Sequence, residues 1–329
     1  MNIWDKLPEP FFVLAPMDDV TDTVFRQIIA STAAPDLFFT EFVNVEALQS
    51  AGRPKTLPKL VFTDIERPLI AQVWGKNPES FYDVARQIAD GSLPKELGLP
   101  EGINFAGIDL NMGCPAKSEV QNGTCSALIL PENRGRAVAM IQACKEGAPS
   151  LPVSVKTRLG YSTVDLTWHE LLLQQNLSAL TIHGRTKSQM SKVPADWNKI
   201  GEIRELRDKL SPTTKIIGNG DVATHDHGLK LAAQYSLDGI MIGRGVFDDP
   251  FVFAKDSPWA DYTPEQKTDL YRQHVELFEK TWQNNERKVI TLNKFCKIYI
   301  QGFDGAVKLR EKLMSADSTD KLLYFLAEL

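Results

Sequence analysis

One cysteine stands where a short apolar run ends in a sharp turn. Residues 107–115 are Gly-Ile-Asp-Leu-Asn-Met-Gly-Cys-Pro. This pattern predicts a buried strand followed by a turn that leaves the Cys114 thiol at the carboxyl tip of the strand. Because free cysteines are most often small packed residues, the residues that gather around Cys114 decide whether its role is chemical.

Other apolar runs also end in polar or glycine residues. These ends carry an amide, basic groups and an imidazole, and they comprise Pro16, Met17, Gln72, Asn111, Lys156, Arg158, His183, Arg185, Asn219, Gly220, Asp221, Gly243, Arg244 and Gly245. One or two such residues would serve as structural caps. So many of them, together with a thiol, favour an active site.

The last two runs end in glycine-rich turns, residues 218–221 and 243–245. Each turn alone is equally well explained as a tight connection from a strand to a helix. As a pair they favour a phosphate site, because glycine lets backbone N–H groups approach phosphate oxygens and Arg244 adds positive charge.

Lys156 and His183 each allow two interpretations. An ammonium group within a strand needs a partner, so Lys156 is either a Schiff-base lysine or a cation facing the anionic edge of a reduced flavin. His183 is either a core histidine or a second hydrogen-bond donor to the same ring. The amide of Gln72 suits the donor and acceptor edge of a flavin.

The elements that must position these residues follow a βα pattern. Eight apolar runs predict strands, at residues 11–17, 37–42, 69–75, 107–113, 153–158, 179–184, 215–221 and 239–245. Helix-period segments lie between them, at 78–90, 134–144, 197–210 and 224–233, and Thr21 or Asp22 is expected to cap a helix through Phe25. No Gly-x-Gly-x-x-Gly follows the first run, so a (β/α)8 TIM barrel is expected rather than an open doubly wound sheet.

The pattern changes after Pro250. Helix-period segments at 268–283, 289–301, 306–314 and 318–329 follow one another with no strand between them. Pro258 and Pro264 bracket a short connector. We therefore predict a barrel domain at residues 1–256 and a small all-helical domain at 263–329.

Composition excludes several classes of protein. Four cysteines without a Cys-x-x-Cys pair predict reduced thiols, so neither a disulfide framework nor a metal centre is expected. No targeting pattern precedes the first run, and no apolar run approaches the roughly 18 residues of a membrane span. We expect a cytoplasmic monomer without membrane contact. The net charge of −5 does not exclude a local phosphate-binding patch.

The motifs together resemble the tRNA-dihydrouridine synthase family over nearly the whole chain. They appear in the family's order as Ala15-Pro16-Met17, Thr40-Glu41-Phe42, Ala71-Gln72, Asp109–Pro115, Lys156-Thr157-Arg158, His183-Gly184-Arg185-Thr186, Gly218–Asp221 and Gly243-Arg244-Gly245. The Asn-x-Gly-Cys-Pro and His-Gly-Arg-Thr elements are the most specific. Ala-Pro-Met and Gly-Arg-Gly recur in other FMN barrels.

The resemblance implies an FMN enzyme that uses NADPH to reduce the C5=C6 bond of uridine in tRNA. It implies FMN contacts by Pro16, Met17, the backbone of Asp18, Gln72, Lys156, His183, Asn219, Gly220, Asp221, Gly243 and Arg244. Cys114 would be the general acid. We expect Asn111, Arg158 and Arg185 to contact the substrate.

The expected chemistry agrees with a thiol acid. Hydride transfer to C6 leaves an enolate-like charge that needs a proton at C5, and a thiol with an ordinary pKa near 8.5 is mostly protonated at neutral pH. The chain departs from the family at Thr124-Cys125, where small residues are usual. Cys125 is expected to be a small packed residue. The loop 186–196 looks variable, so the sequence does not indicate which of its residues contact the substrate.

A basic stretch is the expected tRNA contact. Residues 287–312 hold seven lysines and arginines against Asp304 and Glu311, a local charge of +5, with Phe295 and Tyr299 as packing or stacking groups. A solvated helix face is the alternative. We predict that Lys294 and Lys297 contact tRNA.

Two other functions are compatible with parts of the pattern. A small-molecule oxidoreductase of the dihydroorotate dehydrogenase type would share the FMN and pyrimidine chemistry, but it would not need the helical domain. A non-catalytic RNA-binding flavoprotein would not need the full set of strand-end residues.

Overall fold

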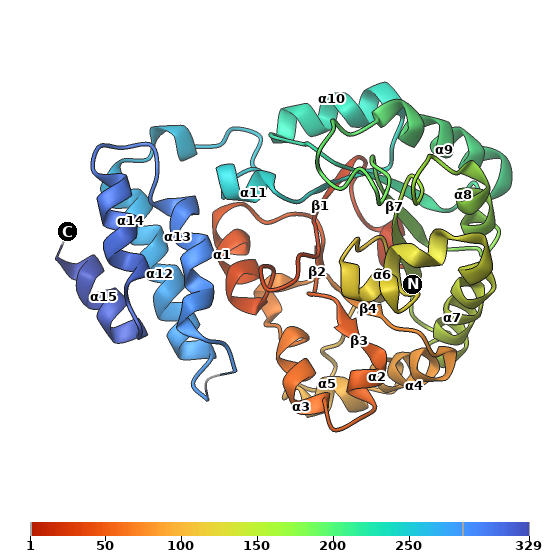
Figure 1. The fold of residues 1–329 in the computed structure, drawn as a ribbon, viewed down its shortest axis with the longest axis horizontal. Helices are drawn as coiled ribbons and strands as arrows, with labels where there is room; N and C mark the ends of the chain where they lie inside the picture. The colour runs from red at the N-terminus through yellow and green to blue at the C-terminus, as the bar shows by residue number, and fades with distance from the viewer. Residues whose placement is uncertain (1, 285, 329) are drawn as a thin grey trace.

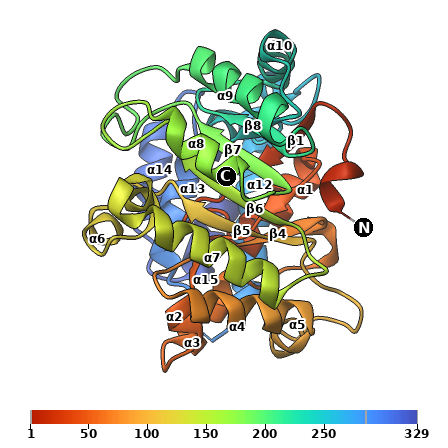
Figure 2. The same cartoon turned by 90° about the vertical axis from the view of Figure 1, so that its right-hand side faces the viewer.

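The computed structural model describes residues 2–284 and 286–328. A ring of helices surrounds a parallel sheet, and a group of C-terminal helices packs beside it (Figures 1 and 2). The strands are β1 (Phe11–Leu14), β2 (Phe38–Phe39), β3 (Val43–Asn44), β4 (Leu69–Trp74), β5 (Gly107–Met112), β6 (Val153–Arg158), β7 (Ala179–His183), β8 (Lys215–Asn219) and β9 (Gly239–Ile242).

The sheet closes into a barrel. Its strand order is β1-β9-β8-β7-β6-β5-β4-β2, with every pair parallel, and β3 also pairs with β4. A parallel bridge between Val13 and Leu37 joins the two ends of this order. The predicted run 37–42 contains only the two-residue strand β2, and β3 follows directly after the run and pairs with the same neighbour, β4. The (β/α)8 class expected from the sequence is confirmed.

The predicted helices form close to the expected positions. The helices are α1 (Thr23–Ala33), α2 (Val45–Leu48), α3 (Arg53–Thr56), α4 (Pro78–Ala89), α5 (Ser92–Glu96), α6 (Lys117–Gln121), α7 (Arg134–Gly147), α8 (Leu166–Leu173), α9 (Trp197–Leu210), α10 (His225–Tyr235), α11 (Gly245–Asp248), α12 (Pro264–Thr281), α13 (Asn293–Tyr299), α14 (Ala306–Met314) and α15 (Thr319–Ala327). Short 3-10 turns lie at Ile3–Asp5, Leu57–Lys59, Asp64–Glu66, Cys125–Ile129, Pro131–Asn133, Trp259–Asp261 and Val289–Leu292.

Side-chain caps explain where several helices begin. The Asp22 carboxylate accepts a hydrogen bond from the Phe25 amide at 2.9 Å, so Asp22 rather than Thr21 caps α1. Thr263 and Gln266 form a reciprocal capping box at the start of α12. The predicted helix from 289 begins as a 3-10 turn and becomes α-helical only at Asn293.

The C-terminal helices pack against α1. The ring centroids of Phe25 and Phe295 are 5.0 Å apart, and His274 lies 4.6 Å from Phe295. These buried rings give the helices a shared apolar boundary with the barrel (Figure 1). The division into domains at 1–256 and 263–329 stays a prediction. Among the residues described, no helix combines the length and the apolar character that a membrane span requires.

Candidate active site

A cavity of about 570 Å³ opens at the carboxyl ends of β1 and β6 to β9. It contains most of the residues expected to hold a cofactor, and its lining includes Pro16, Met17, Lys156, His183, Arg185, Asn219, Gly220, Asp221, Gly243 and Arg244. We call it the cationic cavity. Parallel strands bring these residues together because all of their carboxyl ends meet at one face of the barrel.

Three cations line this cavity. Lys156 donates a hydrogen bond to the Asn219 side chain at 3.3 Å, and burial lowers its pKa to about 8. Arg185 and Arg244 both pair with Asp221, and the second contact is 3.1 Å. Arg244 remains largely exposed, so its guanidinium is free to meet an anion from the solvent side.

His183 is a neutral residue at this site. Burial and the surrounding cations Lys156, Arg158 and Arg185 lower its pKa to about 2. Its Nε2 lies 3.1 Å from an Arg185 guanidinium nitrogen. A neutral imidazole beside three cations can accept or donate a hydrogen bond without adding positive charge.

The turn after β8 has a backbone that few residues adopt. Gly220 has φ of +130°, and a Cβ there would lie 2.7 Å from the Cβ of Ala195. Asp221 follows in the left-handed region at φ 55°. The Asp221 carboxylate accepts a hydrogen bond from the Ala195 amide at 2.9 Å, which ties this turn to the loop after β7.

Cys114 lines a second, smaller cavity of about 330 Å³. We call it the thiol cavity, and its lining comprises Asp18, Phe42, Val43, Asn44, Lys55, Thr56, Lys59, Trp74, Cys114, Ala116, Ser118 and Glu119. Met17 lines the cationic cavity and the next residue, Asp18, lines the thiol cavity. One turn of the chain therefore borders both. Asp18 was expected at the cofactor through its backbone, and its carboxylate pairs with Lys59.

The Cys114 thiol is half-buried and has a second thiol as its neighbour. A hydrogen bond with Cys125 lowers the pKa of Cys114 to about 7, and the Ala116 amide acts in the same direction. The same thiol–thiol contact and burial raise the pKa of Cys125 well above its ordinary value. Cys125 is buried, as expected, but it also shares the environment of Cys114.

A buried polar chain holds the backbone of the Cys114 turn. Asp109 accepts hydrogen bonds from Ser154 at 2.6 Å and from Gln72 at 2.8 Å, and burial raises its pKa to about 6. Asn111 donates to the Gln72 oxygen at 3.1 Å and accepts from the Cys114 amide at 2.9 Å. The Gln72 side chain is fully buried within this chain of contacts, and its expected contact with the cofactor stays a prediction.

The Arg158 guanidinium donates its hydrogen bonds to backbone carbonyls. It donates to Gly113 at 2.7 Å and to Thr186 and Met190 at 3.2 Å each. Burial lowers the pKa of Arg158 to about 10. Arg158 therefore links the Cys114 turn to the loop after β7, and its place as a substrate contact stays a prediction.

The basic stretch divides into exposed and buried members. Lys294 and Lys297 are exposed on α13, as a nucleic-acid contact requires, while Phe295 and Tyr299 are buried and pack within the protein. Arg287 is also buried. Its inclusion in an exposed face with a charge of +5 was wrong, because three carboxylates of the barrel surround its guanidinium.

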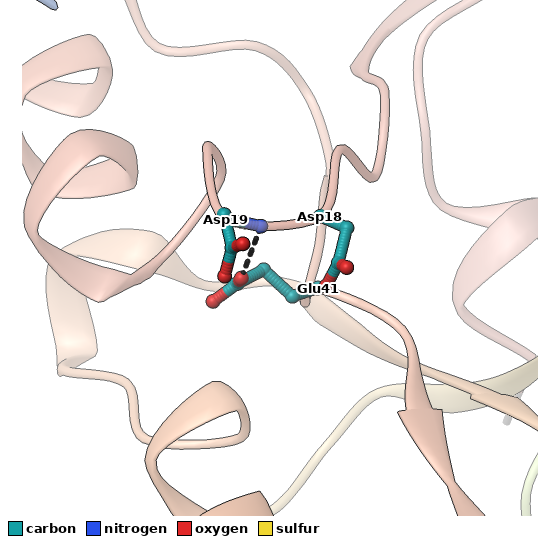
Figure 3. A group of neighbouring side chains, drawn as sticks. All are labelled: Asp18, Asp19 and Glu41. Atoms are coloured by element: carbon teal, nitrogen blue, oxygen red, sulfur yellow. Dashed lines mark hydrogen bonds between the residues drawn. The ribbon is translucent and has the colours of Figure 1, made fainter. Parts of the chain in front are cut away.

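Three acidic residues lie together beside Arg287. Oxygens of Asp18, Asp19 and Glu41 are within 4.8 Å of one another (Figure 3). Lys59 pairs with Asp18, and Arg287 pairs with Glu41. Protein cations therefore balance this cluster. In the sequence, Glu41 stands only within the family motif Thr40-Glu41-Phe42. An acidic residue inside an apolar run indicates that some cation must meet it, although the run does not reveal which one.

The comparisons with known proteins decide the family. The family model described as dihydrouridine synthase matches residues 13–328. The chain belongs to the dihydrouridine synthase family. Its match is 44% identical over 325 residues to the probable tRNA-dihydrouridine synthase 2 of Bacillus subtilis, covering 98% of this chain and 94% of that one. A probable tRNA-dihydrouridine synthase of Staphylococcus epidermidis is 43% identical, covering 96% and 93%.

A solved structure supports the fold. Histamine dehydrogenase from Rhizobium superposes with a TM-score of 0.54 at 14% identity, covering 84% of this chain and 51% of that one. The dihydrouridine synthase match extends through the C-terminal helices, which favours it over the dihydroorotate dehydrogenase type. The expected family and enzyme class are confirmed: the protein is an oxidoreductase of the dihydrouridine synthase family.

Proposed function

We propose that the protein reduces the C5=C6 bond of uridine in tRNA to 5,6-dihydrouridine, with FMN as cofactor and NADPH as reductant. The observation that carries the proposal is the pair of adjacent cavities, one lined by cations and the other by the Cys114 thiol, with Met17 and Asp18 at their border. A reductase acting on a base needs a cofactor site and a proton donor next to each other.

The residues of the cationic cavity fit FMN. Its volume of about 570 Å³ lies in the range of small-molecule and cofactor sites. Arg244 and the glycine turns at 218–221 and 243–245 would hold the phosphate, while Lys156 would face the ring edge that gains negative charge. Pro16, Met17, His183 and Asn219 would hold the remaining groups of the cofactor.

Cys114 would act as the acid. When bound, reduced FMN supplies a hydride to C6 of the uracil. The Cys114 thiol then donates its proton to C5, and the hydrogen bonds from Cys125 and the Ala116 amide stabilise the thiolate that remains. Because Cys114 is half-buried at the cavity surface, solvent can return the proton after each turnover.

The exposed lysines support tRNA as the substrate. Lys294 and Lys297 would contact tRNA phosphates, Asn111 and Arg185 would contact the uracil, and Arg158 would contact the substrate beside them. The target base must leave its stack to reach a buried cofactor. We infer that the protein acts as a cytoplasmic monomer, with neither a metal ion nor a membrane as partner.

Cofactor identity and reductant are tested on the purified protein. We expect a yellow protein from which heat releases FMN, identified by mass, and whose flavin is bleached faster by NADPH than by NADH. We expect tRNA that lacks dihydrouridine to reoxidise the reduced flavin. Orotate, the oxidised pyrimidine of the dihydroorotate dehydrogenase reaction, should not reoxidise it. A colourless protein, or one reoxidised by orotate alone, would contradict the proposal.

A further inference from the structure

The turn at residues 17–21 separates the two cavities. Met17 lines the cationic cavity and Asp18 lines the thiol cavity. The Met17 amide donates a hydrogen bond to the Thr21 hydroxyl at 2.9 Å, and the Thr21 amide donates to the Met17 carbonyl at 3.0 Å. Movement of this short turn would alter the walls of both cavities at once.

Glu41, which lies between β2 and β3, contacts this turn through its side chain. Asp19 lies in the left-handed region at φ 56°, and its amide donates a hydrogen bond to one Glu41 oxygen at 2.7 Å (Figure 3). Glu41 is fully buried. A buried carboxylate and a left-handed aspartate both need support from the surrounding structure, so the position of the turn depends on what Glu41 contacts.

The C-terminal part of the chain supplies that support. Arg287 pairs with the second oxygen of Glu41 and lies 3.5 Å from Asp19 and 3.6 Å from Asp22. The Arg287 guanidinium also stacks 5.5 Å from the centroid of the Trp282 ring. On α13, the Lys294 ammonium donates a hydrogen bond to the Asp19 carbonyl. Two cations of the C-terminal segment, Arg287 and Lys294, thus contact the turn between the cavities or the Glu41 side chain that binds it.

We propose that Arg287 is a positioning residue that, through Glu41, holds the turn at 17–21 at a fixed place between the C-terminal helices and the two cavities. Because the proposed function assigns tRNA binding to these helices, the inference rests on that function. The Arg287–Glu41 pair then sets where a bound tRNA presents its uridine relative to Cys114. Neither residue of the pair lines the cationic cavity or the thiol cavity.

The variant Arg287→Met tests the proposal. Methionine keeps the length and apolar stem of the side chain but leaves Glu41 without its cation. We expect reoxidation of the flavin by saturating tRNA to slow by about tenfold or more, as small misplacements of a reacting group do. Reduction of the flavin by NADPH should slow by a smaller factor, because Thr21 still holds Met17 at the cationic cavity, whereas Asp18 at the thiol cavity adjoins the Asp19 amide that Glu41 holds. Arg287→Lys restores the charge and is expected to recover part of the tRNA-dependent rate.

A double-mutant cycle with Glu41→Gln separates positioning from folding. Glutamine still accepts the hydrogen bond from Asp19 and carries no charge. Burial raises the pKa of Glu41 to about 7 even beside Arg287, so without Arg287 the single variant must either bury an unpaired carboxylate or take up a proton on folding. We therefore expect the Arg287→Met/Glu41→Gln protein to unfold at higher urea concentration than Arg287→Met alone, although its reoxidation by tRNA stays slow. Arg86→Met is the control, because Arg86 lies on the barrel helix α4 and pairs with Asp90 at 3.3 Å. It should leave both flavin half-reactions unchanged.

Two results would overturn the inference. One is reoxidation of both Arg287→Met and the double variant by tRNA at the wild-type rate. The other is an additive urea cycle, which would show that Arg287 and Glu41 do not act together. If the reduced wild-type protein is not reoxidised by tRNA at all, the proposed function fails, and the urea cycle alone then judges whether Arg287 and Glu41 hold the turn together.

Discussion

The two neighbouring thiols make Cys114 a stronger acid than an isolated cysteine. The Cys125 contact lowers the pKa of Cys114 to about 7, while burial and the same contact keep Cys125 protonated. An acid with a pKa near the working pH transfers its proton readily and is still protonated in a large share of the molecules. The second cysteine therefore tunes the first.

Removing Cys125 should shift the pH dependence of proton transfer. Cys114 donates a proton only in its thiol form, so the single-turnover rate of tRNA reduction should fall as pH rises through about 7. In Cys125→Ala the thiolate of Cys114 loses a hydrogen bond, and its pKa should rise toward the ordinary value of about 8.5. The alkaline limb of the rate profile should then shift to higher pH, as measured by flavin reoxidation between about pH 6 and 9.

Cys144→Ala is the matched control for this profile. Cys144 is buried in α7, and burial raises the pKa of its thiol beyond the range of the experiment. Its loss should leave the limb where it is in the wild type. An alkaline limb that stays in place in Cys125→Ala would remove Cys125 from the tuning role.

At the residue scale, the sequence indicates which side chains can do chemistry, but it does not show which other side chains they contact in the fold. Cys114 and Lys156 were predicted from their places at strand ends, and both line cavities. The Gln72 amide donates a hydrogen bond to Asp109 on the neighbouring strand, and this partner could not be read from the place of Gln72 in the sequence. Arg287 was predicted as a surface cation because its partner cannot be seen in its own stretch of sequence. That partner is the buried Glu41, 246 positions away in the chain. Such long-range partners leave no local pattern.

At the scale of elements, short strands deliver their carboxyl ends to one face while glycine turns shape the cavity. The turn after β8 depends on Gly220, where a Cβ would meet both Ala195 and His183. The backbone there also has φ of +130°. The lack of space and the backbone conformation therefore both exclude a larger residue at position 220.

Gly220→Ala should weaken cofactor binding more than it weakens the fold. The added methyl must displace Ala195 or His183, and alanine is strained at this φ, so we expect a loss of about 1–3 kcal/mol at the turn. The measurement is the flavin content of the purified protein and the dissociation constant for added FMN. Gly135→Ala in α7 is the control, because no atom lies within 4 Å of a Cβ there. Normal flavin affinity in Gly220→Ala would contradict this account of the turn.

Periodicity located the elements well where they are long and regular. The segment 197–210 was predicted as a helix and is α9, and 306–314 is α14. The run 37–42 was predicted as one strand, but only Phe38 and Phe39 of it form a strand, β2, and β3 begins just beyond it at Val43. Between the two strands lies Glu41, whose side chain contacts Arg287 and the Asp19 amide. Apolar character alone does not reveal that break.

At the scale of the whole molecule, an acidic protein presents a local basic face. The net charge is −5, yet Lys294 and Lys297 are exposed together on α13. Lys294 also reaches the Asp19 carbonyl at the border of the two cavities. A polyanion bound at this face would therefore lie close to the turn that borders Cys114.

Charge reversal at both lysines should weaken tRNA binding. Loss of two phosphate contacts in Lys294→Glu/Lys297→Glu should lower affinity and reduce the slope of log affinity against log salt by about 2. Filter binding or fluorescence anisotropy across a salt series measures both quantities. Lys230→Glu, at an exposed position on α10, is the control. Unchanged affinity and salt slope in the double variant would rule out this face as the tRNA contact.

Mass spectrometry of the tRNA product tests the central claim most directly. Unmodified tRNA is incubated with the purified protein, FMN and NADPH, digested, and mapped nucleotide by nucleotide. We predict that a defined uridine gains two hydrogen atoms with the wild-type protein, and that Cys114→Ala retains FMN but loses most of this product. Wild-type protein that leaves every uridine unchanged, or Cys114→Ala that forms dihydrouridine at the wild-type rate, would contradict the account.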